Sequence, residues 1–277
     1  MPVDSLAIPA VAASRPGARA ERLYYRTDGP YAGPGPAFYD VETLAWARAW
    51  AARLAESWPA IRREYEDNVR RGADHVVDVF NPAGPKIPGW RSVNFQTYDW
   101  RFHPARRAFP VTTAILDAIP GLTSAYINVL EPHARIDAHW GDSNAIVRFH
   151  LGLDVPAGDC AVRVADETRQ SANGRLLGFS DAHEHSSWNA TGERRVVLVF
   201  DVMRPEYRPR RRWICANVLA AMAVVWLEAR LPRYGRSTAA LHRVGRTVPL
   251  PRPIRTTLRR AIGAVGCFVL PIQRRWR

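Results

Sequence analysis

Short runs rich in Val, Phe, Tyr and Trp dominate the chain between residues 75 and 202, and Pro and Gly separate them. Such runs predict β-strands, and many short strands joined by turns are typical of a sandwich or a barrel. Alternating strand–helix units are disfavoured, because only residues 111–119 predict a short helix, which Pro120 and Gly121 end. The predicted strands are 75–80, 90–98, 124–130, 145–153, 160–164, 175–179 and 194–202.

A helix is predicted before the strands. Apolar residues recur at steps of three and four between residues 44 and 65, with Asp40 available as the N-cap. Pro59 is expected to kink or restart this helix, with Ser57 as a second cap. We expect the apolar face to pack on a sheet; it consists of Leu44, Ala47, Leu54, Trp58, Ile61 and Tyr65.

Residues 1–38 are expected to form a flexible N-terminal arm. Their apolar run follows Asp4 and is interrupted by Pro, so it lacks the basic start and continuous apolar stretch of a secretory signal. The cysteines Cys160, Cys215 and Cys267 show no C-x-x-C spacing, which disfavours a disulfide framework and a zinc ribbon. These features predict a cytoplasmic protein in a reducing compartment.

The positive charge is concentrated at the C-terminal end of the chain. The formal net charge is +13, but residues 204–277 hold 17 arginines and two glutamates and carry +15, which leaves −2 for residues 1–203. A body so close to neutral lacks the basic surface of a nucleic-acid-binding protein, so no nucleic-acid partner is predicted. Residues 208–277 are interpreted as a basic appendage.

Two apolar segments lie within this appendage. Residues 213–227 contain one polar residue, Asn217, and residues 261–272 are bracketed by arginines. A helix over 213–227 would be about 22 Å long, which is short against a bilayer core of about 30 Å. Tryptophans at the edges and arginines around the segments predict docking on an anionic membrane surface, peripherally on its inner face. The alternative is a pair of helices that covers the barrel as a lid.

Histidines carry most of the chemical information. The chain lacks the G-x-x-x-x-G-K, G-x-G-x-x-G, G-x-S-x-G and H-E-x-x-H motifs, which disfavours the common nucleotide-binding, serine hydrolase and zinc protease classes. His139 and His185 lie 46 residues apart, each at the end of a strand and beside turn residues. This separation suits metal ligands from different strands, although a lone histidine is more often structural. Arg195, ten residues beyond His185, strengthens the pair as candidates.

Arginines within the predicted strands indicate an anion. Because strand side chains alternate, Arg148 and His150 share one face, opposite the face of Val147, Phe149 and Leu151. In the same way, one of the two arginines at 194–195 must face inward. Two inward arginines without inward carboxylates would require a bound dianion, because an unpaired buried charge is costly. The alternative places both arginines at the rim in surface salt bridges.

Three segments together resemble a known family. INVLEPHARIDAHWGDSNAIVRFHLGLDVP, CAVRVADETR and LGFSDAHEHSSWNATGERRVVLVFDVMRPE are similar to the core of the aspartyl/asparaginyl β-hydroxylases. The R-x-H-L-G-L block with its distant H-x-x-W and Arg is specific, and the resemblance covers residues 90–207. It implies a double-stranded β-helix that uses Fe(II), 2-oxoglutarate and O2.

The resemblance also implies residue roles. His139 and His185 would bind iron, with His183 as a rival ligand, and Arg148, His150 and Arg195 would hold the 2-oxoglutarate carboxylates. Gly141 stands where the wider oxygenase superfamily has the carboxylate of an H-x-D motif, which leaves water or Asp142 as the third ligand. Asn128 falls where many relatives carry a serine near 2-oxoglutarate.

The expected fold is mainly β with flanking helices. Residues 39–207 form a jelly-roll or cupin-like core, and residues 208–277 add the helical basic appendage. The expected activity is hydroxylation of an unactivated C–H bond, in peptide Asp/Asn residues or in a membrane-proximal lipid acyl chain. Alternatives are a non-catalytic, membrane-associated binding module on a decayed oxygenase barrel, and a cupin-like metalloenzyme that needs no 2-oxoglutarate.

Overall fold

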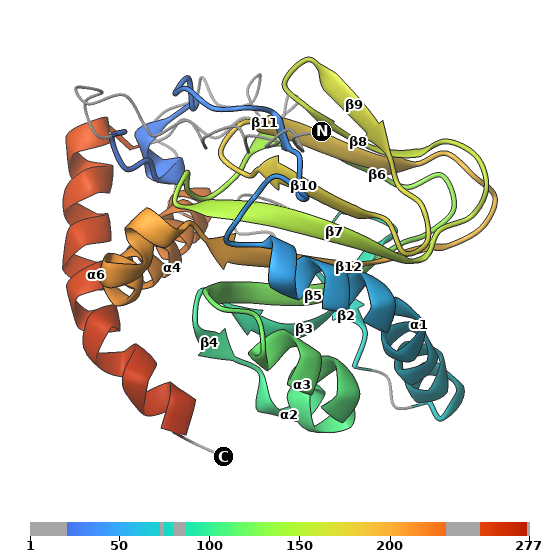
Figure 1. Ribbon diagram of the computed structural model, residues 1–277. Helices are drawn as coiled ribbons and strands as arrows, with labels where there is room; N and C mark the ends of the chain where they lie inside the picture. The colour runs from blue at the N-terminus through green and yellow to red at the C-terminus, as the bar shows by residue number, and fades with distance from the viewer. Residues whose placement is uncertain (1–20, 73–74, 80–86, 231–249, 276–277) are drawn as a thin grey trace, which may run out of the picture.

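The computed structural model of the chain describes residues 21–72, 75–79, 87–230 and 250–275. Two antiparallel sheets form its centre (Figure 1). The larger sheet has the order β1-β10-β7-β12-β5-β3-β2, with β4 paired to β3, and the smaller has the order β6-β11-β8-β9.

The strands of the larger sheet are β1 Phe38–Tyr39, β2 Val77–Asp78, β3 Trp90–Thr97, β4 Trp100–Arg101, β5 Leu122–Leu130, β7 Ile146–Asp154, β10 Leu176–Ser180 and β12 Arg195–Met203. Those of the smaller sheet are β6 Arg135–Trp140, β8 Cys160–Val164, β9 Glu167–Gln170 and β11 Glu184–Asn189. Two such sheets make a double-stranded β-helix, as expected from the sequence.

The outer face of the larger sheet carries the main apolar core. Val147, Phe149 and Leu151 of β7 are fully buried there, as the alternation of β7 predicts. They pack with residues of α1 (Arg48–Arg70), and the ring of Trp50 meets the ring of Phe149 edge-on at 5.1 Å. Helices α2 (His103–Ala108) and α3 (Pro110–Asp117) complete this layer. The opposite face of β7 is therefore left for the space between the two sheets.

Helix α1 differs from its predicted form in its start and at its proline. It begins at Arg48 after Ala47, so the prediction that Asp40 is the N-cap is wrong. Asp40 instead accepts the backbone N–H of Glu42 in a turn, at 3.2 Å. Pro59 lies inside a continuous helix, and Ser57 donates to the carbonyl of Arg53 at 2.7 Å instead of capping a second helix. The apolar face continues on both sides of Pro59, and its burial outweighs one lost backbone hydrogen bond.

The predicted strands and the observed strands agree for the apolar runs and disagree for the polar ones. The seven predicted runs correspond to β2, β3, β5, β7, β8, β10 and β12, and the predicted short helix corresponds to α3. The sequences of β6 (RIDAHW), β9 (ETRQ) and β11 (EHSSWN) were not among the predicted strands, nor were the two-residue strands β1 and β4. At least half of the residues in β6, β9 and β11 are polar or charged, so these strands lack the apolar runs from which strands were predicted. The two strands that carry His139 and His185 are among those that were not predicted.

The C-terminal appendage forms two helices, α4 (Arg211–Arg230) and α6 (Arg252–Arg275), which pack against each other (Figure 1). A Cβ at Gly263 of α6 would lie 2.9 Å from the Asn217 side chain of α4, so glycine permits this close approach. The buried residues of α4 include Ile214, Cys215, Ala216, Val218, Ala220, Ala221 and Val224. These buried residues pack on the protein, while Trp213 and Trp226 are 39% and 36% exposed. None of the helices within the described residues is both long and apolar enough to span a bilayer.

Part of the expected N-terminal arm is built into the fold. Residues 21–29 bind the loop after β6: Tyr24 donates its backbone N–H to Asn144 at 2.9 Å, and Arg26 donates its backbone N–H to the carbonyl of Asp142 at 3.1 Å. Thr27 is fully buried, within the 3₁₀ helix η1 (Arg26–Asp28). The prediction of a flexible arm is therefore wrong for residues 21–29, and residues 1–20 lie outside the described residues.

Candidate active site

His139 and His185 face each other across the smaller sheet. They are direct cross-strand partners on β6 and β11, and their ring centroids lie 4.3 Å apart. Nδ1 of His139 lies 2.8 Å from the carbonyl oxygen of Asp137, and Nδ1 of His185 lies 2.9 Å from that of His183. A carbonyl oxygen only accepts hydrogen bonds, so each Nδ1 carries the proton and each Nε2 presents a lone pair.

Burial keeps both rings neutral. It lowers the pKa of His139 to about 4 and holds the pKa of His185 well below its usual range. Neutral imidazole with a free Nε2 is the form that binds transition metals. The backbone carbonyl of His183, the rival ligand, accepts the hydrogen bond from Nδ1 of His185. The His183 ring meets the Tyr31 ring edge-on, with the ring centroids 5.1 Å apart. The geometry therefore favours the pair His139 and His185.

Asp181 is a site residue that the sequence analysis did not single out. Its carboxylate is fully buried, and Oδ1 lies 3.8 Å from Nε2 of His185. Oδ2 accepts the backbone N–H of Asp142 at 2.8 Å, and burial raises the pKa of this carboxyl to about 7 against the opposing effect of Arg148. The sequence feature that could have identified Asp181 is its position four residues before His185, which lies at the start of a strand.

Gly141 explains the absence of an H-x-D carboxylate. A Cβ at this position would lie 2.1 Å from the carbonyl oxygen of Asp181 and 2.2 Å from its Oδ2. The room that a side chain at 141 would need is thus filled by Asp181. The side chain of Asp142, the other candidate third ligand, accepts from the Tyr98 hydroxyl at 3.1 Å and lies 3.6 Å from Arg26. Among the residues that the structure describes, no three His, Cys, Asp or Glu side chains are grouped to hold a metal ion.

Arg148 does not need a bound dianion. It donates through Nε and Nη2 to both carboxylate oxygens of Asp201, at 2.7 and 2.9 Å, and its Nη1 lies 2.6 Å from Asp181. Both acids are fully buried on the side of β7 that faces the smaller sheet. The premise that no carboxylates face inward is therefore wrong for Arg148. Its first role in the structure is to neutralise two buried acids and to fix the position of Asp181.

Arg195 is a buried cation for which the described residues supply no carboxylate partner. It is 1% exposed, and its Nη1 donates to Ser187 Oγ at 2.7 Å and to the carbonyl of Trp188 at 3.1 Å. Its Nε has no hydrogen-bond partner, and no carboxylate pairs with it within the described part of the chain. Burial lowers the pKa of this guanidinium to about 10. The rim salt bridge considered as an alternative belongs to Arg194, which donates to Glu131 at 3.1 Å.

His150 and Asn128 lie on the same side of the larger sheet as Arg195. His150 pairs with Val199 of β12, and its buried Nδ1 has no partner among the described residues. Its pKa is held well below the usual range, first by burial and then by Arg195 and Arg148. Asn128 pairs with Val197, two residues beyond Arg195 on β12. The structure thus places Arg195, His150 and Asn128 on the face of the larger sheet that is turned toward the smaller sheet, which carries the histidine pair.

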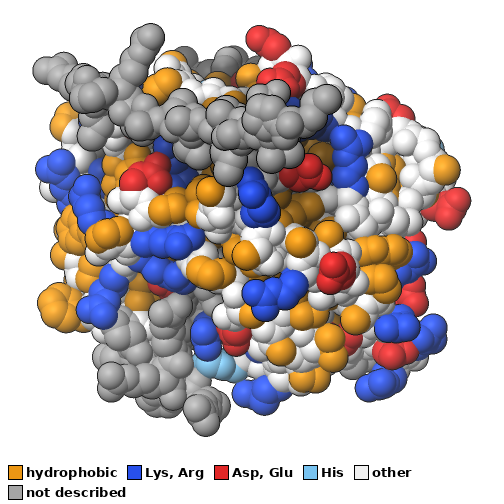
Figure 2. All heavy atoms as spheres, viewed as in Figure 1, with side chains coloured by type: hydrophobic (Ala, Val, Ile, Leu, Met, Phe, Trp, Pro, Cys, Tyr) orange, Lys and Arg blue, Asp and Glu red, His pale blue; other side chains and the backbone are white. Residues whose placement is uncertain are grey.

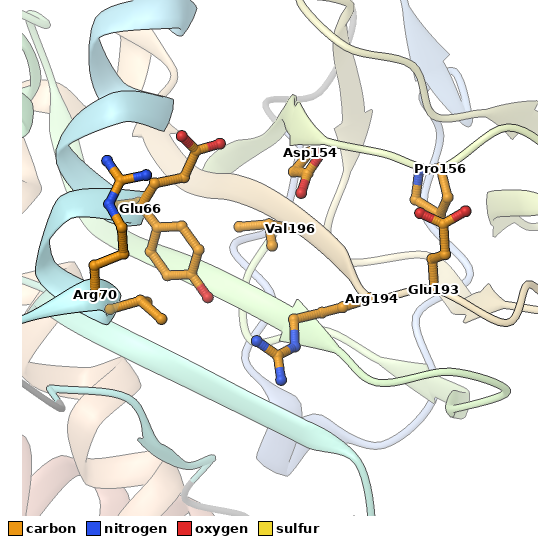
Figure 3. Close-up of a pocket in the computed structure, with 9 residues that line it drawn as sticks. Glu66, Arg70, Asp154, Pro156, Glu193, Arg194 and Val196 are labelled. Atoms are coloured by element: carbon orange, nitrogen blue, oxygen red, sulfur yellow. The ribbon is translucent and has the colours of Figure 1, made fainter. Parts of the chain in front are cut away.

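A separate surface pocket of about 320 Å³ lies outside the barrel (Figure 3). Glu66 and Arg70 of α1 line one side, and Glu193 and Arg194 line the other. Val196 also lines it and belongs to the helix-facing core, on the opposite face of β12 from Arg195. No histidine of the candidate site reaches this pocket, so we do not assign the chemistry to it.

Comparison with known proteins identifies the family. The model of the aspartyl/asparaginyl β-hydroxylase family matches residues 55–205, which is more than half of the chain. The chain belongs to this family. The matched range contains all six candidate site residues and ends before α4 and α6, so the basic appendage lies outside the family domain. Membership supports a hydroxylase activity.

Two relatives show the range of substrates in the family. An ornithine lipid ester-linked acyl 2-hydroxylase from Rhizobium tropici is 32% identical over 193 residues, which cover 66% of each chain. The human aspartyl/asparaginyl β-hydroxylase is 29% identical over 167 residues, which cover 57% of this chain but 22% of the human protein. The chain therefore spans less than two thirds of either relative.

Solved structures add little to this comparison. A sugar phosphate isomerase of the cupin superfamily from Silicibacter pomeroyi is 15% identical and covers 43% of this chain and 62% of its own, with a TM-score of 0.29. A predicted oxalate decarboxylase from Thermotoga maritima is 9% identical and covers 47% and 92%, with a TM-score of 0.31. These scores are too low to carry an argument, so the fold assignment rests on the strand order.

Proposed function

We propose that the protein is an Fe(II)- and 2-oxoglutarate-dependent dioxygenase that hydroxylates a C–H bond of a lipid acyl chain. The observation that carries the proposal is Arg195, a fully buried guanidinium with no counterion among the described residues, between the same two sheets as a pair of neutral histidines. Two free Nε2 atoms suit Fe(II), and an uncompensated buried cation suits a carboxylate. Both halves of the expected donor set fit.

His139 and His185 would hold the iron through Nε2. When bound, iron and 2-oxoglutarate supply the oxidation, in which O2 inserts one oxygen atom into the substrate while 2-oxoglutarate becomes succinate and CO2. The backbone carbonyls of Asp137 and His183 fix the tautomer and orientation of both rings. Asp181, held by Arg148, places a carboxylate oxygen 3.8 Å from Nε2 of His185.

Arg195 would hold a carboxylate of 2-oxoglutarate. Ser187 and the carbonyl of Trp188 hold one end of its guanidinium and leave Nε without a partner. A planar guanidinium can grip a carboxylate at two points, which orients the cosubstrate as well as binding it. His150, with its unpartnered Nδ1, and Asn128 are the neighbouring polar groups that would complete the anion site.

A lipid substrate is favoured over a peptide. The similarity to the ornithine lipid acyl hydroxylase extends over 66% of both chains, whereas the similarity to the human β-hydroxylase covers 22% of that protein. Peptide Asp/Asn hydroxylation is the second candidate, favoured by the family model itself. The proposal retains a cytoplasmic location, with which the free Cys160, Cys215 and Cys267 agree.

The test is substrate oxidation by the purified full chain. The protein is incubated with Fe(II), ascorbate and 2-oxoglutarate, separately with a bacterial lipid extract and with Asp- and Asn-containing peptides, and products are read by mass spectrometry. We expect lipids with one added oxygen, and no such product from the His139→Ala variant. Oxygenated peptide with unchanged lipid would transfer the proposal to the peptide substrate. Oxidation that proceeds without 2-oxoglutarate would indicate the cupin-like alternative, and no oxidation of either substrate would favour the binding module.

A further inference from the structure

Helix α6 presents an apolar face to the outside of the molecule. Among the described residues, five of the twelve exposed large hydrophobic side chains lie on this helix. Val265 is 64% exposed and Phe268 is 78% exposed. Spacings of three, four and seven place the exposed residues on one side of the helix. The five are Ile254, Ile262, Val265, Phe268 and Val269.

The opposite side of α6 attaches the helix to the protein. A Cβ at Gly266 would lie 3.3 Å from the Cβ of Ala216 on α4, and Leu270 is buried between the helices. Arg259 donates to Asn217 Oδ1 at 2.9 Å and stacks on the ring of Tyr25 at 4.0 Å. The packing of α6 is therefore satisfied without its apolar outer face, and this face has no partner within the described chain.

The charges around this face are positive. Helix α6 contains six arginines and no acidic residue, and the two glutamates at 206 and 228 are each paired with an arginine. Glu206 lies 2.7 Å from Arg204, and Glu228 lies 3.0 Å from Arg255. Figure 2 shows hydrophobic and basic side chains intermingled on the side of the molecule where α6 lies. An occupant of this face must cover apolar side chains and supply negative charge.

We propose that α6 lies flat on an anionic lipid surface, with its apolar face inserted at the level of the headgroups and its arginines against lipid phosphates. Such helices combine an apolar face with basic flanks and lie in the plane of the interface. A second copy of the chain would bring two equally basic appendages together, so self-association does not satisfy the charge.

Docking through α6 would bring the candidate active site close to the lipid. The first turn of α6 reaches η1, where Arg252 donates to the carbonyl of Asp28. Arg26 of η1 bonds the carbonyl of Asp142, and Asp142 donates its N–H to Asp181 beside His185. This short series of contacts places the start of the docked helix at the same end of the barrel as the histidine pair. The docking itself does not depend on the proposed function.

The test is binding of the full chain to vesicles, without iron or 2-oxoglutarate. We expect it to sediment with vesicles of equal parts phosphatidylcholine and phosphatidylglycerol, to do so less as salt increases, and to remain in solution with pure phosphatidylcholine. The double variant Val265→Ser/Phe268→Ser should bind the anionic vesicles at least about tenfold more weakly than the unmodified chain, because two inserted side chains lose their apolar contact. Its fold should persist, since both side chains are exposed.

The matched control is Val69→Ser/Val111→Ser, which changes two side chains that are 44% and 45% exposed on α1 and α3. This variant should bind anionic vesicles like the unmodified chain. Unmodified protein that stays in the supernatant at low salt would overturn the proposal, as would equal binding by the α6 variant. A dimer in sedimentation velocity without lipid that the α6 variant lacks would assign the face to a second copy instead.

Discussion

Replacing Arg195 by methionine should lower the stability of the ligand-free protein by at most about 3 kcal/mol while it abolishes 2-oxoglutarate binding. Burial lowers the pKa of Arg195 from 12.5 to about 10, which means that the folded protein disfavours the charged form by about 3 kcal/mol. Methionine has a similar length, removes this cost and gives up two hydrogen bonds worth about 1–3 kcal/mol each. Ser187 keeps its hydrogen bond to the carbonyl of Ala161 at 3.1 Å. The expected change in unfolding free energy therefore lies between a gain of about 1 kcal/mol and a loss of about 3 kcal/mol.

Arg148→Met is the matched control for this prediction. Arg148 is also buried, but it neutralises Asp201 and Asp181, which would remain without a cation. Removing one partner of a buried ion pair costs about 3–5 kcal/mol, so this variant should be strongly destabilised. The two substitutions are chemically identical and differ only in whether the arginine has a counterion.

The assay is urea unfolding of the three proteins, with and without 2-oxoglutarate and Mn(II) in place of Fe(II). We expect 2-oxoglutarate to stabilise the unmodified chain and to leave Arg195→Met unchanged, because a ligand stabilises only the state that binds it. Ligand-free Arg195→Met that unfolds as easily as Arg148→Met would refute the reasoning, since Arg195 would then be a structural residue.

Three further outcomes follow from the site. Arg195→Lys should weaken 2-oxoglutarate binding by about 10- to 100-fold and leave metal affinity unchanged in calorimetric titration, because lysine cannot make a planar two-point contact; equal cosubstrate affinity would contradict the role of Arg195. Gly141→Ala should destabilise the protein by about 1–3 kcal/mol in thermal unfolding, because its Cβ would lie 2.1 Å from the Asp181 carbonyl oxygen; an unchanged melting temperature would show that this contact relaxes. Asp201→Asn should destabilise the protein without changing the number of bound metal ions, because Asp201 bonds Arg148 and neither histidine; loss of the metal would place Asp201 in the metal site.

The sequence predicts the larger sheet better than the smaller one. The strands β3, β5, β7 and β12 are long and apolar because one face contacts the helices, and this burial is visible as a pattern. Strands β6 and β11 are short and polar, and their pairing depends on contacts between residues far apart in the chain. The histidines on them were placed at strand ends from their spacing and from the neighbouring turn residues, although the predicted strand ranges did not include residues 135–140 or 184–189.

The buried acids show why the electrostatics of the site could not be predicted fully. Alternation places Arg148 on an inward face, but only the register of β7 and β12 shows that Asp201 lies opposite Arg148. Asp181 reaches the same guanidinium from the start of the turn before β11. Among the described residues no carboxylate pairs with Arg195, so the premise of the sequence argument is met at Arg195 and fails at Arg148. The alternation of side chains along one strand shows which face a residue lies on, but it does not show which charged residues the neighbouring strands place beside it.

The measurement that tests the central claim most directly is the fate of ¹⁸O2 during turnover by the purified protein with Fe(II), 2-oxoglutarate and the lipid extract. If the two histidines and Arg195 form a 2-oxoglutarate-dependent dioxygenase site, mass spectrometry should find one ¹⁸O atom in succinate and one in the hydroxylated lipid, and neither product in the His185→Ala variant. A hydroxylated lipid that appears without labelled succinate would contradict the account.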